Sequence, residues 1–101
     1  MGWKVILAPS AGSDLEEIVS YVARHNPDAA SRLSYALIAR AELLTQFPEL
    51  GRQVPEFARK DLRELVHRSY RIIYRVKQAE QLIEVVRFWH AARGLPRIPQ
   101  A

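Results

Sequence analysis

Three runs of β-branched and aromatic residues follow one another closely in the second half of the chain, and they constrain the fold most. The runs span residues 62–67, 70–77 and 81–89, and only short polar links separate them. Strands that are joined so tightly must pair antiparallel. The middle run alternates, so its side chains divide into two faces, with Tyr70, Ile72, Tyr74 and Val76 on one and Arg71, Ile73, Arg75 and Lys77 on the other. We expect the first face to pack on helices and the second to present a basic surface.

The first half of the chain predicts one strand and two helices. Residues 3–7 are apolar except for one lysine, which is typical of a short strand. Apolar residues then recur at helical spacing as far as residue 22, with Ser10 or Ser13 as the N-cap. Asn26 and Pro27 end this helix and begin a second one, which runs to Phe47. The order β-α-α-β-β-β predicts an α+β domain, with a helix hairpin on one face of a small, mainly antiparallel sheet.

Two segments lack a regular pattern. Residues 48–61 contain two prolines, a glycine and several charges, so they predict a loop or an irregular connection. Residues 94–101 hold too many helix breakers for a long helix, and we expect this tail to fray. A chain of 101 residues has room for one domain, so residues 1–101 are expected to form a single unit.

The composition excludes several classes of site. The chain has no cysteine, which rules out disulfides and thiolate chemistry and suits a reducing cytoplasm. Its three histidines are far apart in sequence, so we expect no metal site, and no motif for a bound cofactor is present. Neither a signal peptide nor a membrane-spanning run is found, which predicts a soluble cytoplasmic protein.

Charge is divided unequally between the halves of the chain. Residues 1–50 hold four Lys and Arg against six Asp and Glu, whereas residues 51–101 hold eleven against five. Twelve of the fifteen cations are arginine, whose planar fork suits phosphate and carboxylate groups. Arg71, Arg75 and Lys77 could together hold a phosphate chain, or they could be ordinary solvated residues. This asymmetry indicates a negatively charged partner.

His90 ends the last strand and is the strongest candidate for proton transfer. An imidazole held there by the sheet could exchange protons with an RNA 2′-hydroxyl or a leaving 5′-oxygen. The alternative is that His90 only hydrogen-bonds the turn that follows it.

The same elements carry a family resemblance that covers nearly the whole chain. It rests on Ala11-x-x-Asp14-Leu15-x-x-Ile18-x-x-Tyr21, Asn26-Pro27-Asp28, the run from Phe47 to Glu56, Leu62-Arg63-Glu64-Leu65, the run from Tyr70 to Val76, and the run from Ile83 to Arg93. In order and spacing these pieces resemble the RelE/ParE superfamily of bacterial type II toxin–antitoxin systems, which includes plasmid stabilisation proteins. The resemblance implies a growth-inhibiting toxin that an antitoxin neutralises by wrapping it with a segment that is acidic where it docks.

Two activities compete within this superfamily. ParE-like members inhibit DNA gyrase, whereas RelE-like members cut messenger RNA on the ribosome without a metal. Gly51-Arg52-x-x-Pro55-Glu56 and the ending Val86-Arg87-Phe88-Trp89-His90 look more like the ParE branch, which we favour. A third alternative is a non-toxic relative that only binds its antitoxin.

The resemblance also assigns roles to single residues. If the chain is RelE-like, Arg71 matches the arginine that stabilises the phosphorane and His90 lies near the terminal acid or base. The residues expected to bind partners are Arg52, Arg63, Arg75, Arg87, Trp89 and Arg93. Operator DNA would be contacted only through the antitoxin.

Overall fold

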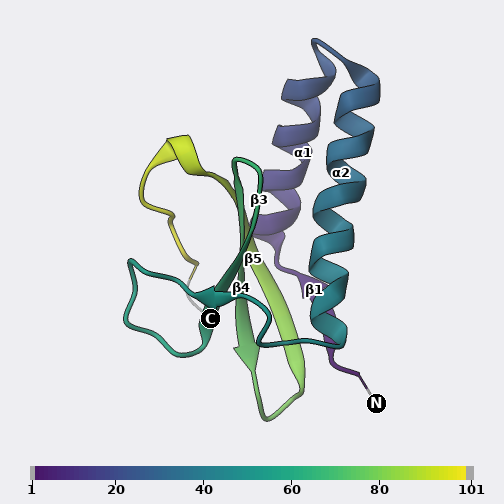
Figure 1. Ribbon diagram of the computed structural model, residues 1–101. Coiled ribbons are helices and arrows are strands. Elements are labelled where there is room, and N and C mark those ends of the chain that lie inside the picture. Colours follow the sequence, from purple (N-terminus) through teal and green to yellow (C-terminus); the bar gives the residue numbers. More distant parts are fainter. Residues whose placement is uncertain (1, 100–101) are drawn as a thin grey trace.

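The computed structural model describes residues 2–99 and contains one five-stranded sheet with two helices against it (Figure 1). The strands are β1 (Lys4–Leu7), β2 (Arg52–Gln53), β3 (Leu62–His67), β4 (Tyr70–Lys77) and β5 (Leu82–His90), and the helices are α1 (Pro9–Ala23) and α2 (Pro27–Glu42). Short 3-10 turns follow at Leu43–Thr45 and Ala91–Arg93. The sheet order is β1-β5-β4-β3-β2, and only the β1–β5 pair is parallel. The predicted α+β class is therefore confirmed.

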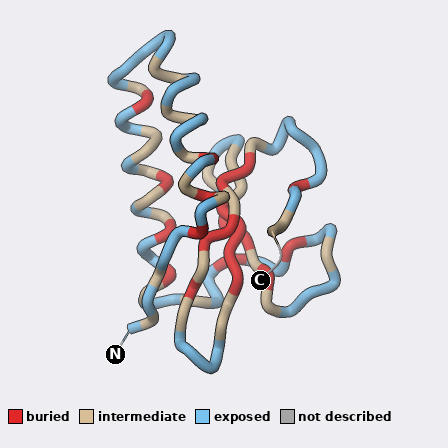
Figure 2. The backbone as a smooth tube through the Cα atoms, turned by 180° about the vertical axis from the view of Figure 1, so that it is seen from behind, coloured by how far each residue is buried: buried red, intermediate tan, exposed pale blue. Residues whose placement is uncertain are grey.

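The helix hairpin covers one face of the sheet and extends beyond its end (Figure 1). The main core lies between the two layers and includes Leu37 and Leu44 with Ile72, Tyr74 and Phe88, all nearly inaccessible to solvent. Burial of each such side chain contributes about 1.5–3 kcal/mol. The buried residues follow the strands and the inner sides of the helices, whereas the tip of the hairpin is exposed (Figure 2). The prediction that the tyrosine-bearing face of β4 packs on the helices is confirmed.

The helix starts agree only partly with the capping predictions. Asn26 caps α2, because its side chain accepts a hydrogen bond of 3.0 Å from the N–H of Ala29. α1, however, begins at Pro9 without a side-chain cap, so the assignment of Ser10 or Ser13 to that role was wrong. The hydroxyl of Ser10 instead donates to the carbonyl of Val86 at 2.6 Å. A tertiary partner has replaced the local one.

The other face of the sheet carries a second, smaller core. It consists of Ala8, Val54, Leu62, Ile73, Val86 and Trp89, with Phe57 and Ile98 packed against it. The loop before β3 and the tail after β5 supply the residues that cover this face. The tail was expected to fray, yet Ile98 packs against this core and Pro96 is buried, whereas Leu95 and Arg97 are exposed; Gly94 turns the chain at φ 80°. Residues 100–101 lie outside the described part of the chain.

The segment expected to be a loop is held at one point by a tight contact. It contains the two-residue strand β2, which the sequence did not predict. The hydroxyl of Tyr74 donates to the carbonyl of Pro48 and accepts from the N–H of Gly51, each at 2.9 Å. A Cβ atom at Gly51 would lie 2.5 Å from the carbonyl oxygen of Glu64, so only glycine fits. The loop is thereby tied to the sheet.

Helices that could cross a membrane are absent from residues 2–99.

Candidate functional site

Arg71 lies on the sheet face that points away from the helices, which we call the arginine face and define by Arg71, Arg75, Arg87 and Trp89. Its guanidinium makes two bonds to Glu56, of 2.7 and 2.8 Å, and its Nε donates to Glu64 at 2.6 Å. Only 11% of the side chain is exposed. The bonds to Glu56 raise the pKa of Arg71, and the same contact lowers the pKa of Glu56. Two carboxylates, those of Glu56 and Glu64, are therefore already paired with this guanidinium.

Glu64 is the centre of this network. Its side chain is wholly buried and accepts from Arg71 on one side and from Arg52, at 2.8 Å, on the other. Arg52 remains 64% exposed, whereas Arg63 turns back to donate to the carbonyl of Gly51 at 2.7 Å. A buried carboxylate requires such charged donors. The arginines of β2 and β4 therefore satisfy an internal acid.

Arg75 and Arg87 are also occupied by groups of this chain. Arg75 donates to Glu84 at 2.9 Å and to the carbonyl of Pro99 at 2.7 Å. Arg87 makes bonds of 2.6 and 2.8 Å to the buried carboxylate of Asp14, which also accepts the N–H of Phe88 at 3.0 Å. Asp14 belongs to α1, so this pair fastens the helix to β5.

Trp89 completes the arginine face as a support for two cations. The guanidinium carbons of Arg87 and Arg93 lie 4.7 and 4.0 Å from the centre of its ring, within the range of cation–π attraction. The indole N–H donates to the carbonyl of Gly94 at 3.0 Å. Arg93 is exposed and makes no salt bridge with any described residue. It is the cation of this group that is best placed to meet a partner.

The prediction of an open basic platform on this face was wrong. Arg71 and Arg75 do lie on the predicted side of β4, but acidic side chains neutralise both, and the second core and the tail cover the space between them. Lys77 lies 3.7 Å from Glu84 and is likewise paired. The sequence shows which side of a strand an arginine occupies, but it does not show the carboxylate that meets it.

Arg71 and His90 do not form one site. His90 stands opposite Tyr70 in the β4–β5 pair, whereas Arg71 stands opposite Trp89, so their side chains project from opposite faces of the sheet. The ring of His90 contacts that of Tyr70, with centroids 5.0 Å apart. A phosphate could not contact both groups in this conformation.

The ring of His90 caps the turn that follows β5. Its Nδ1 accepts a hydrogen bond of 3.0 Å from the N–H of Ala92. A neutral imidazole that accepts at Nδ1 carries its proton on Nε2, which is then a hydrogen-bond donor. Protonation of Nδ1 would break the cap. The alternative reading of His90, as a residue that hydrogen-bonds the turn, matches this contact.

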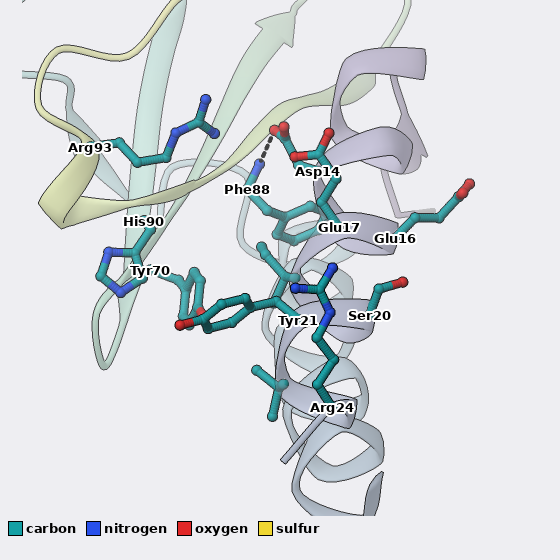
Figure 3. Close-up of a pocket in the computed structure, with 12 residues that line it drawn as sticks. Asp14, Glu16, Glu17, Ser20, Tyr21, Arg24, Tyr70, Phe88, His90 and Arg93 are labelled. Atoms are coloured by element: carbon teal, nitrogen blue, oxygen red, sulfur yellow. Dashed lines mark hydrogen bonds between the residues drawn. The ribbon is translucent and has the colours of Figure 1, made fainter. Parts of the chain in front are cut away.

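A cleft lies on the helix side, between α1 and the ends of β4 and β5 (Figure 3). Its volume is about 880 Å³. Tyr21 reaches from α1 toward Tyr70 and His90, and Phe88 lies above them in this view, beside Asp14 (Figure 3). Burial, and then the neighbouring Tyr21, raise the pKa of Tyr70. Charged side chains stand around this aromatic wall, and they are Asp14, Glu16, Glu17, Arg24 and Arg93.

The sequence reasoning missed the residues that build this site. Asp14 and Glu64 are the buried acids that organise the arginines, and Tyr21 and Tyr70 form the wall of the cleft. Tyr21 is 62% exposed, and it lies beside the other aromatic side chains of the cleft rather than alone. A tyrosine on the outer side of an amphipathic helix was the signal that could have revealed it.

Comparisons with known proteins agree with this fold. A family model described as the ParE toxin of the type II toxin–antitoxin system parDE matches residues 5–95. Toxin RelE2 of Caulobacter vibrioides is 38% identical over 91 residues, which are 89% of this chain and 97% of that protein. Toxin RelE1 of the same organism is 29% identical over 90 residues, which are 89% of this chain and 95% of that protein.

Two solved structures share the architecture. A chain of the chromosomal ParDE system from P. aeruginosa has a TM-score of 0.71 at 22% identity, covering 87% of this chain and 95% of its own. A chain of the RelBE2 toxin–antitoxin complex from Mycobacterium tuberculosis has a TM-score of 0.66 at 19% identity, covering 89% and 99%. The fold, the family match and the relatives agree, and the chain belongs to the ParE toxin family, within the RelE/ParE superfamily of type II toxin–antitoxin toxins.

Proposed function

We propose that this toxin acts as a ParE-like inhibitor of DNA gyrase, by binding and without bond chemistry of its own. The carrying observation is the separation of Arg71 from His90, because the one pair that RNA cleavage would use lies on two faces of the sheet. Arg71 is also held by Glu56 and Glu64, which leaves no free fork for a phosphorane. The match to the ParE family model supports the same branch. Gyrase acts in the bacterial cytoplasm, so we place the protein there.

The test is a supercoiling assay with purified components. The unmutated protein should block supercoiling of a relaxed plasmid by gyrase, and a matched topoisomerase I reaction should proceed normally. Full supercoiling at a large molar excess of toxin would count against gyrase as the target.

The second candidate is a RelE-like, ribosome-dependent endoribonuclease, and the curated relatives named RelE2 and RelE1 favour it. In this case Arg71 would have to leave Glu56 to reach a phosphate. Substituting Glu56→Gln should then speed cleavage of mRNA in a translation extract, and Arg71→Lys should abolish it. Intact mRNA in the presence of the unmutated protein would remove this candidate.

The third candidate is a relative that binds its antitoxin but has lost toxicity. Expression in a bacterial host without antitoxin distinguishes it, because normal growth at a verified protein level would exclude both toxic activities.

We further propose a cognate antitoxin with an acidic docking segment, since the structural neighbours come from toxin–antitoxin complexes. Of the residues expected to bind partners, Arg52 and Arg93 are exposed. Arg52 is exposed although it also bonds to Glu64, and the other residues of that set, Arg63, Arg75, Arg87 and Trp89, are less exposed and bond to groups of this chain. An acidic segment would therefore meet Arg52 or Arg93 first. Substituting each of these two with Glu should weaken antitoxin binding in a titration, and unchanged affinity for both would contradict this docking.

A further inference from the structure

β5 is longer than the strand beside it. β1 pairs with β5 only from Leu82 to Val85, whereas β5 continues to His90. The first turns of α1 supply side chains to part of the remaining edge. The hydroxyl of Ser10 donates to the carbonyl of Val86, and the carboxylate of Asp14 accepts the N–H of Phe88. Side chains thus replace a strand at these two positions.

The next two main-chain groups along this edge have no such replacement. The N–H of Ala91 bonds to the carbonyl of Ser69, so the N–H of residue 91 points toward β4. Main-chain groups alternate along a strand, so the N–H of residue 90 points toward the open edge. The carbonyl of Phe88 and the N–H of His90 therefore point away from β4. Within residues 2–99 no strand or side chain bonds to either group. Unpaired groups on a strand edge are a template for another strand.

This open edge borders the aromatic cleft. Phe88 and His90 line the cleft together with Tyr21 and Tyr70, so a strand added here would place its side chains against an apolar wall. Tyrosine and arginine are the residues that most often dominate binding energy at protein interfaces. Arg93 stands at the rim and is held over Trp89 without an acidic partner among the described residues. The edge therefore offers main-chain bonding and an apolar contact, and its positive charge lies at Arg93, across the cleft from the acids Glu16 and Glu17 of α1.

We propose that an extended segment of the acidic antitoxin adds to β5 at this edge. Its main chain donates to the carbonyl of Phe88 and accepts from the N–H of His90, as in other cases of strand addition. One apolar side chain enters the cleft beside Tyr21, and a carboxylate meets Arg93. This inference rests on the proposed antitoxin partner but not on gyrase as the target.

The backbone of His90 permits a direct test of the main-chain contact. Its φ is −71°, close to the value that proline requires, and the residue before it lies in a strand, as proline also prefers. His90→Pro removes the edge N–H without removing a bond to β4. His90→Ala is the matched control, because it also loses the ring and the cap on Ala92 but keeps the N–H. Circular dichroism and thermal melting of both variants verify that they are folded.

The readout is the Kd for the cognate antitoxin, measured by calorimetry on the full-length chain. One lost hydrogen bond should make His90→Pro bind about fivefold more weakly than His90→Ala. Equal affinities would overturn the proposal. Hydrogen exchange on the unmutated protein gives a second measurement that needs no variant: the amide of His90 should become protected on binding, and an unchanged rate there would also overturn the proposal.

The outcomes separate this inference from the proposed target. If His90→Pro binds the antitoxin more weakly than His90→Ala but the toxin leaves gyrase uninhibited, the gyrase assignment is overturned and the edge contact is supported. Absence of binding by the unmutated chain would overturn the antitoxin partner and the edge contact together, whatever the supercoiling assay shows.

Discussion

The arginine face and the cleft differ in how each uses its charges. On the arginine face, Arg71, Arg75 and Arg87 all have acidic partners in this chain, and a second core lies between them. In the cleft, aromatic side chains are left half-open and the arginines at the rim have no salt bridge within residues 2–99. In this chain, the region of the sequence that is richest in arginine therefore uses those arginines to pair with acids of the same chain. The surface available to a partner is the one with fewer cations.

The largest effect is expected when a buried acid of the arginine face is removed. Asp14→Ala should lower the free energy of unfolding by about 3–5 kcal/mol, because it leaves Arg87 and the N–H of Phe88 without their acceptor. Denaturant unfolding followed by circular dichroism measures this. Asp61→Ala is the matched control, since it breaks the exposed pair with Arg59 and only a long 4.0 Å contact with Arg75, and it should cost under about 1 kcal/mol. Equal losses of unfolding free energy in the two variants would contradict the distinction between buried and exposed ion pairs.

The next effect concerns the contact that ties the loop to the arginine face. Gly51→Ala should destabilise the protein by about 1–3 kcal/mol, because the new Cβ would meet the carbonyl of Glu64 and the hydroxyl of Tyr74. Gly12→Ala in α1 is the control. Its Cβ would meet nothing within 4 Å, so it should stabilise the protein by about 0.4–1 kcal/mol. Thermal melting should move the two variants in opposite directions, and a shift of the same sign would refute the packing argument.

The cleft should show the reverse pattern, with binding affected and stability unchanged. Tyr21→Ala should alter unfolding by less than about 0.5 kcal/mol, as is usual for exposed positions. It should weaken antitoxin binding about tenfold if Tyr21 is an anchor of the interface. Tyr35 is 80% exposed on α2 and does not line the cleft, so Tyr35→Ala should leave the Kd unchanged. A similar loss for both tyrosines would place the interface elsewhere.

The smallest effect is a dependence of stability on pH. The bond from Arg71 lowers the folded-state pKa of Glu56 below its ordinary value of 4.5. The unfolded chain therefore takes up this proton first, and the stabilisation is present above pH 4.5 and is lost as the pH falls through the folded-state pKa. Glu56→Gln should flatten this part of the stability–pH curve. Parallel curves for Glu56→Gln and the unmutated protein would show that this pair contributes nothing.

The sequence predicted the layers of the fold better than the contacts of the site. Alternation in β4 has a period of two, so the two faces followed from the residue types of Tyr74 and Arg75 alone. A charged side chain in the interior is rare and its partner is distant in sequence, so the pairing of Asp14 with Arg87 could not be inferred. The cap expected of Ser10 failed for the same reason, since its hydroxyl bonds to Val86. Local rules identify elements, and long-range contacts decide what each polar group does.

The parallel pairing of β1 with β5 also governs when the molecule can be completed during its synthesis. Lys4 stands beside Leu82, so this contact closes a loop of most of the chain, whereas β3, β4 and β5 join through short turns. Loops of that size close late in folding. On the ribosome, β1 and α1 cannot reach their places until β5 has emerged, and only then does the aromatic cleft exist. A partner that binds at this cleft would therefore bind the completed toxin and not the nascent chain.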